Sequence, residues 1–192
     1  MGLDMYLKRA NLHGYSIKQA EAANAYLTMM QNNEENPEDQ CNSISKWAGV
    51  DDSLLDMGAV EALRPELQAS YFDLDVNKLF PQYDIFVQVG YWRKANAIHH
   101  WFVQNVQNGV DDCQSYAVSR EQLEALRGLC ESVISGNVKP KKALPVYDGF
   151  YFGTQKYDDS YFQDLRDTIA IVDKVVAETD WDIQTVCYEA SW

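Results

Sequence analysis

The chain lacks the residue patterns that mark common metal, redox and membrane sites. Its four cysteines, Cys41, Cys113, Cys130 and Cys187, never fall in the CxxC or CxH spacing of zinc knuckles and thioredoxin-like sites. No apolar run approaches the ~20 residues of a membrane span. The opening MGLDMYLKR has no apolar core of a signal peptide. We therefore expect no cofactor, no metal, no membrane association and a cytoplasmic location.

Positive charge is also scarce. Sixteen Lys and Arg stand against twenty-nine Asp and Glu, a formal charge of −13 over 192 residues. Such a field repels phosphates, so we do not expect direct binding to nucleic acid. An acidic surface can instead dock onto a partner protein that has a basic surface. The same surface can also serve only to keep the protein soluble, and both interpretations remain open.

Catalytic signatures are missing as well. The chain has no P-loop, no GxGxxG between a strand and a helix, no GxSxG and no kinase motif set. Its three histidines are His13, His99 and His100. Adjacent helix residues point about 100° apart, so His99 and His100 cannot share one metal with ordinary geometry. No catalytic residue is assigned, and the balance favours a protein that is not an enzyme.

The apolar residues, 46% of the chain, suffice for a core, and the length fits one domain over residues 1–192. Alternation over residues 3–8 predicts an N-terminal strand, and IQTVCYEASW predicts a C-terminal one. A short strand is expected at QSYAV, and a strand or hairpin at VYDGFYFG. Ser16 is expected to cap a helix that runs to Met30, and a second helix is expected over 90–107. Ser119 and Gln122 predict a capping box for a helix through Ile134, and Asp158 or Asp159 is expected to cap the last helix. Residues 31–45 are expected to be a polar loop. The predicted class is α+β: a helix-rich single domain with a small sheet that includes both terminal strands.

The segment VGYWRKANAIHHWFV, residues 89–103, is dense in side chains that can both stack and form hydrogen bonds. On the predicted helix, Tyr91, Ala95, Ile98 and Phe102 would form an apolar stripe facing the core. Beside them, Trp92, Asn96 and His99 would line the boundary between core and solvent, with Arg93 and Lys94 at its margin. Such side chains can stack on a ligand and bind its polar edge. A core rim that holds a satisfied histidine explains the same pattern equally well.

A second cluster runs from Tyr147 to Thr154 and continues to Tyr157 and Asp158. Its glycines permit close backbone approach, and Tyr157 with Asp158 could wall a pocket. The favoured interpretation is plainer: a core strand with a glycine turn, followed by an aspartate that caps the next helix.

Several motifs together resemble a known family. These are MGLDMYL, VGYWRKANAIHHWFVQNVQNGVDDC, GFYFGTQKYDDSYFQDLRDT and the terminal Trp192. They resemble uncharacterised small proteins encoded by phages, prophages and gut bacteria. The resemblance covers both ends and the centre of the chain, and it carries over no catalytic role. The matching polar positions, which we take as candidate ligand-binding or interaction residues, are Asp4, Tyr6, Trp92, Arg93, Lys94, Asn96, His99, Asp112, Tyr157 and Asp158.

A phage origin implies a counter-defence function. The first hypothesis is an anti-CRISPR-type inhibitor in a bacterial host, which binds a nucleic-acid enzyme such as a CRISPR-Cas nuclease through its acidic surface. The second is a sponge that sequesters a nucleotide ligand in an aromatic and basic pocket built on Trp92, Arg93, Lys94, Asn96 and His99. The third is a small cytoplasmic enzyme, with His99 as general base supported by Asp112 or Asp158.

Overall fold

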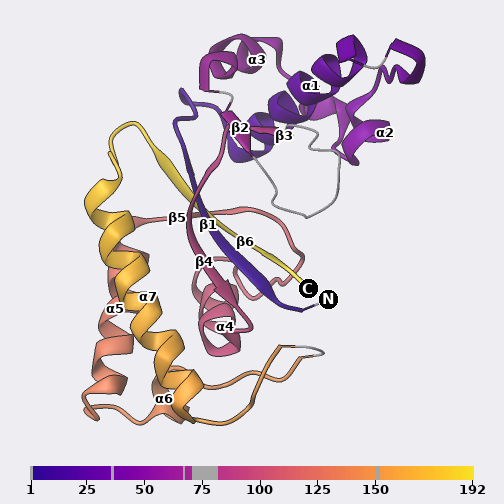
Figure 1. Cartoon of the computed structure of the whole chain (residues 1–192). Helices are drawn as coiled ribbons and strands as arrows, with labels where there is room; N and C mark the ends of the chain where they lie inside the picture. The colour runs from indigo at the N-terminus through magenta and orange to yellow at the C-terminus, as the bar shows by residue number, and fades with distance from the viewer. Residues whose placement is uncertain (1, 36, 67, 71–81, 150–151) are drawn as a thin grey trace. The chain divides into compact units, whose positions relative to one another are not determined.

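The computed structural model describes residues 2–35, 37–66, 68–70, 82–149 and 152–192 (Figure 1). The chain forms two compact units. Unit 1 comprises Met1–Arg9 and Gln88–Trp192, and unit 2 comprises Ala10–Val87. The α+β class is confirmed, as is a small sheet that contains both terminal strands. The expectation of a single domain over residues 1–192 stays a prediction.

Unit 1 is built on an antiparallel four-stranded sheet in the order β4-β1-β6-β5. Its strands are β1 (Asp4–Ala10), β4 (Val87–Arg93), β5 (Tyr116–Val118) and β6 (Thr185–Ser191). β5 pairs with β6 so that Tyr116 lies opposite Tyr188 and Val118 opposite Val186. Because side chains alternate along a strand, one face of β1 is apolar, and its residues Met5 and Leu7 are fully buried.

Helices cover the apolar face of this sheet (Figure 1). They are α4 (Asn96–Asn105), α5 (Arg120–Ile134), α6 (Pro140–Ala143) and α7 (Asp159–Glu178). The capping box predicted at Ser119 and Gln122 begins α5, and the side chain of Asp158 caps α7. Helices α5 and α7 pack side by side, and an ion pair joins Arg127 of α5 to Asp173 of α7.

Unit 2 is mostly helical. It contains α1 (Ile17–Glu35), α2 (Ile44–Ala48), α3 (Met57–Leu63) and the two-stranded sheet of β2 (Gln68–Ser70) and β3 (Gln82–Asp84). Short 3-10 turns occur at Pro37–Asp39 (η1), Asp52–Leu54 (η2) and Arg64–Glu66 (η3). The Oγ of Ser16 accepts the Gln19 N–H at the start of α1, so the predicted cap is confirmed. The core joins α1 to α3 and includes Ala20, Ala23, Leu27, Val60 and Leu63.

Three sequence-based expectations differ from the structure. α1 continues to Glu35, so irregular backbone occupies less of residues 31–45 than predicted; its glutamine and glutamate residues are good helix formers. The described parts of VYDGFYFG, residues 146–149 and 152–153, are not strand, and Phe150 and Tyr151 lie outside the described residues. The predicted helix over 90–107 is wrong in its first part, where the chain is a strand.

The break between β4 and α4 removes the predicted helical stripes. β4 runs to Arg93, and Lys94 then takes a left-handed backbone with φ of 61° before α4 begins at Asn96. The side chain of Tyr91 is 41% exposed instead of facing the core. Valine and aromatic residues fit strands well, and hydrogen bonding of β4 to β1, which is distant in sequence, selects the strand.

Candidate functional site

Asn96 holds an irregular segment against the start of α4. Its amide nitrogen donates to the carbonyl oxygens of Phe152 (3.1 Å) and Thr154 (2.9 Å), and its Oδ1 accepts the Tyr147 N–H at 3.0 Å. Gly153 makes the close approach possible: its φ is +98°, and an added Cβ would lie 2.8 Å from the Lys94 carbonyl oxygen. Asn96 is 4% exposed, and these three backbone groups occupy its amide.

His99 lies at the centre of a buried polar network. Its Nδ1 is 2.7 Å from the Tyr188 hydroxyl, and its Nε2 is 3.0 Å from Oδ2 of Asp111. The other carboxylate oxygen of Asp111 accepts the indole N–H of Trp192 at 3.1 Å. Aromatic rings enclose the imidazole: Phe152 meets it edge-on, with ring centroids 5.4 Å apart. His99 and Tyr188 are both 0% exposed.

The protonation state of this network follows from its partners. Burial lowers the pKa of His99, although the Asp111 carboxylate opposes that shift. A neutral imidazole has one N–H, and a carboxylate can only accept, so Nε2 carries the hydrogen. Nδ1 then accepts from Tyr188, whose own pKa burial raises well above its ordinary value. Each ring nitrogen of His99 thus has a partner, and the side chain is fully buried. This arrangement fits a structural histidine.

Trp92 is buried too. The strand places its ring beneath the helices, 4% exposed, where its indole N–H donates to Thr168 Oγ1 of α7 at 2.9 Å. Trp92, Asn96 and His99 therefore do not line a boundary with solvent as predicted. Their polar atoms contact distant parts of unit 1, and their surfaces offer little area to a ligand.

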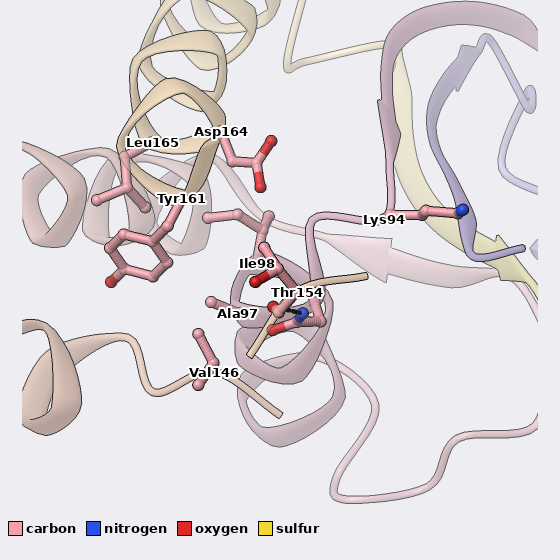
Figure 2. A pocket seen from close by; sticks show the side chains of 9 residues that line it. Lys94, Ala97, Ile98, Val146, Thr154, Tyr161, Asp164 and Leu165 are labelled. Carbon is pink, nitrogen blue, oxygen red and sulfur yellow. Dashed lines mark hydrogen bonds between the residues drawn. The ribbon is translucent and has the colours of Figure 1, made fainter. Parts of the chain in front are cut away.

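A small pocket lies beside Asn96 (Figure 2). Its cavity volume is only about 20 Å³, and Asp164 of α7 is its one carboxylate. Burial raises the pKa of Asp164 to about 6, and the charges of Asp167 and Asp158 add to the shift. The ammonium group of Lys94 points away from this carboxylate (Figure 2). No hydrogen-bond or ionic partner of the Asp164 carboxylate occurs among the described residues.

Three other predicted residues meet on the sheet face opposite the helices. The Tyr91 hydroxyl donates to Oδ1 of Asp4 at 2.5 Å, and Nε of Arg93 lies 4.0 Å from the same oxygen. The Asp4 carboxylate raises the pKa of Tyr91. The rings of Tyr6 and Tyr91 are tilted, with centroids 5.5 Å apart. Asp4, Tyr6 and Arg93 thus share one polar and aromatic patch.

The remaining predicted residues organise local backbone. Asp112 accepts the Gln114 N–H at 3.1 Å and the Tyr116 hydroxyl at 3.0 Å. Asp158 caps α7, and the ring of Tyr157 stands edge-on to Tyr161 with centroids 5.0 Å apart. Asp111, next to the predicted Asp112, is the carboxylate that reaches His99. Sequence could point to this aspartate pair but could not choose between its members.

Unit 2 carries most of the net negative charge. Its sequence has thirteen acidic and four basic residues, a formal charge of −9, whereas unit 1 has sixteen acidic and twelve basic residues, −4. An exposed region of unit 2, here named the α2–η2 surface, comprises Lys46, Trp47, Asp51, Asp52 and Ser53. Trp47 is 38% exposed on this surface.

Hydrogen bonds fix the two carboxylates of the α2–η2 surface. Asp52 accepts from the Ser43 hydroxyl at 2.8 Å and from the Ile44 N–H at 2.9 Å. Asp51 accepts the Ser53 N–H at 2.9 Å. These bonds lower the pKa of both aspartates, through Ser43 and Ser45 for Asp52 and through Ser53 for Asp51. Both side chains therefore stay ionised in fixed positions.

Comparison with known proteins gives no relative: no family model, no curated protein and no solved structure matches the chain. Within the described residues, every helix falls short of the length and apolar character that crossing a membrane requires. In the same part of the chain, no three His, Cys, Asp or Glu side chains gather closely enough to hold a metal ion.

Proposed function

We propose that this protein acts by binding another protein through unit 2, in the cytoplasm of a bacterial host. The proposed partner is a nucleic-acid enzyme with a basic groove, and a CRISPR-Cas nuclease is the target to test first. The observation that carries the proposal is the concentration of negative charge, −9 of −13, on 78 residues of unit 2. The phage-family resemblance remains a prediction and adds the counter-defence setting.

The α2–η2 surface supplies the features that a protein interface needs. Asp51 and Asp52 are held in position, so little side-chain entropy is lost when they meet arginine or lysine. Trp47 adds an exposed aromatic anchor beside them, and tryptophan is enriched among the residues that dominate binding energy. A fixed pair of carboxylates next to an aromatic ring suits a groove that normally holds phosphates and bases.

Charge neutralisation tests the electrostatic part of the proposal. The variant Glu34→Gln, Glu38→Gln, Glu61→Gln removes three exposed carboxylates from unit 2. The matched control Glu124→Gln, Glu178→Gln, Asp182→Asn removes three from unit 1. Each set includes one glutamate in an ion pair on a helix surface. We expect the first variant to associate more slowly with the nuclease and with a weaker salt dependence, and the control to change little. Equal effects of both sets would refute a role for unit 2.

Trp47→Ala tests the anchor without removing a helix cap, since alanine is a good helix former. The control is Ile183→Ala, which truncates a side chain of unit 1 that is 57% exposed. We expect inhibition of DNA cleavage to weaken on the order of tenfold or more for Trp47→Ala alone. The proposal fails if purified CRISPR nucleases neither bind the intact chain nor lose activity with it.

The two alternative functions have less support. A nucleotide sponge built on Trp92, Asn96 and His99 would need stacking area that these buried residues lack. An enzyme with His99 as general base would need substrate access to an imidazole that is 0% exposed, and its partner would be Asp111 instead of Asp112 or Asp158.

A further inference from the structure

A second pocket lies on the opposite side of α4 from the network of His99. Its cavity volume is about 170 Å³, smaller than the usual range for small-molecule sites, so it can enclose only part of a ligand. Its walls come from α4, the end of α6 and the residues that follow α6. They are Ala97, His100, Trp101, Gln104, Asn105, Ala143, Leu144 and Pro145. Most of this lining is apolar, and Trp101 and Leu144 are themselves buried.

Two polar side chains at this pocket have unused hydrogen-bonding capacity among the described residues. His100 and Gln104, one helical turn apart on α4, form no hydrogen bond or ion pair with any described residue. The ring of His100 is held in place because it stacks on Tyr147, with centroids 4.5 Å apart and planes 8° from parallel. Burial and the neighbouring His99 lower the pKa of His100. A neutral imidazole and an amide can each donate and accept, which suits the polar edge of a heterocycle.

Positively charged residues lie next to this lining, although the net charge of the whole chain is negative. Lys139, Lys141 and Lys142 lie at α6, immediately before the lining residues Ala143 and Leu144. All three lysines are exposed, and none forms an ion pair within the described residues. The Ala143 N–H donates to the Lys139 carbonyl at 3.2 Å, so these residues belong to one turn. In a chain of charge −13, three unpaired lysines in four residues are well suited to bind an anionic group.

We propose that this pocket binds a nucleoside monophosphate. The planar base lies against Ala143 and Pro145, which are half-buried and supply an apolar floor. Gln104 and His100 bind the polar edge of the base, and the lysines of α6 bind the phosphate as mobile point charges. The site differs from the one predicted around Trp92, and it lies in unit 1, so it is independent of the interface proposed for unit 2.

Calorimetric titration with AMP, GMP, CMP and UMP tests this proposal on the full chain. We expect at least one monophosphate to bind, with its nucleoside and inorganic phosphate each binding about tenfold more weakly, because each keeps only part of the contacts. The variant Lys139→Gln, Lys141→Gln, Lys142→Gln should lower affinity about tenfold, which corresponds to three exposed charge contacts. Gln104→Ala, on an exposed helix position, should weaken binding and alter the preference among bases.

A matched control separates local contacts from net charge. Lys18→Gln, Lys46→Gln, Lys174→Gln removes three exposed lysines elsewhere, and it should leave affinity almost unchanged. The proposal is overturned if none of the four nucleotides binds at concentrations up to about 5 mM. It is also overturned if inorganic phosphate binds as tightly as the nucleotide, or if the control set weakens binding as much as the α6 set does.

Discussion

Replacing Asp164 by asparagine should stabilise the protein at neutral pH. The Asp164 carboxyl is half-buried in the pocket beside Asn96, and its pKa of about 6 lies above the ordinary value of 3.8. A raised pKa means that the folded state holds the proton more tightly than the unfolded state does. The free energy of unfolding therefore falls as pH rises from about 4 to about 6, and above that range the full penalty of an ionised, partly buried carboxylate remains.

The size of the effect follows from the same shift. About two pKa units correspond to ~3 kcal/mol, and solvent screening of a partly exposed group reduces this to roughly 1–2 kcal/mol. Asp164→Asn keeps the shape of the side chain and removes its charge. We expect it to raise the free energy of unfolding by that amount at pH 7.5, and to leave it nearly unchanged at pH 4.

Urea denaturation followed by tryptophan fluorescence measures this difference. Four of the five tryptophans lie in unit 1, so the signal reports mainly on the unit that contains Asp164. Asp182→Asn is the control, because Asp182 is exposed and the variant should match the parent at every pH. The reasoning is refuted if Asp164→Asn is less stable than the parent at pH 7.5, or if its effect is the same at pH 4 and pH 7.5.

Four further outcomes are expected from unit 1. Tyr188→Phe removes the donor to His99 Nδ1 and leaves a buried acceptor unpaired, so it should cost about 1–3 kcal/mol in urea denaturation; a loss below about 0.5 kcal/mol would contradict the network. Gly90→Ala places a Cβ 2.6 Å from Ile171 Cγ2 and should destabilise by about 1–3 kcal/mol. A Cβ at Gly128 would meet no atom within 4 Å beyond its chain neighbours and its own helix backbone, so Gly128→Ala should instead stabilise α5 by about 0.5–1 kcal/mol. The same sign for both substitutions would be evidence against this packing. Because burial lowers the pKa of His99, the contribution of His99 to the free energy of unfolding is present above the ordinary histidine pKa and is lost as pH falls below it. Titration of the imidazole by NMR should show a midpoint below that of a free histidine. A midpoint at or above that value would oppose the assignment.

Local sequence signals predicted the ends and faces of several elements. Ser119 and Gln122 form the expected capping box, Asp158 caps α7, and β1 buries alternate residues. These features depend on side chains within a few positions of one another, so their spacing alone indicates them. The apolar faces of α5 and α7 likewise follow from the spacing of residues within each helix.

The segment from residue 89 to 103 shows where such signals fail. Tyr91, Ala95 and Ile98 recur at helical spacing, yet VQVGYW also has the valines and aromatics of a strand. The choice between them depends on β1, some eighty residues earlier, which hydrogen-bonds to β4. No window of local sequence contains that partner, so the helical stripes drawn through Tyr91 and Trp92 could not have been recognised as wrong beforehand.

What the sequence by itself determined is the acidic charge, the absence of familiar catalytic motifs, the helix caps and the two terminal strands, because each is a property of composition or of near neighbours. Only the tertiary structure decided that Trp92, Asn96 and His99 are buried. Their partners, Thr168, Phe152 and Tyr188, lie 76, 56 and 89 positions away. A polar side chain is a ligand-binding group or a core group according to what meets it, and folding alone brings those distant groups together.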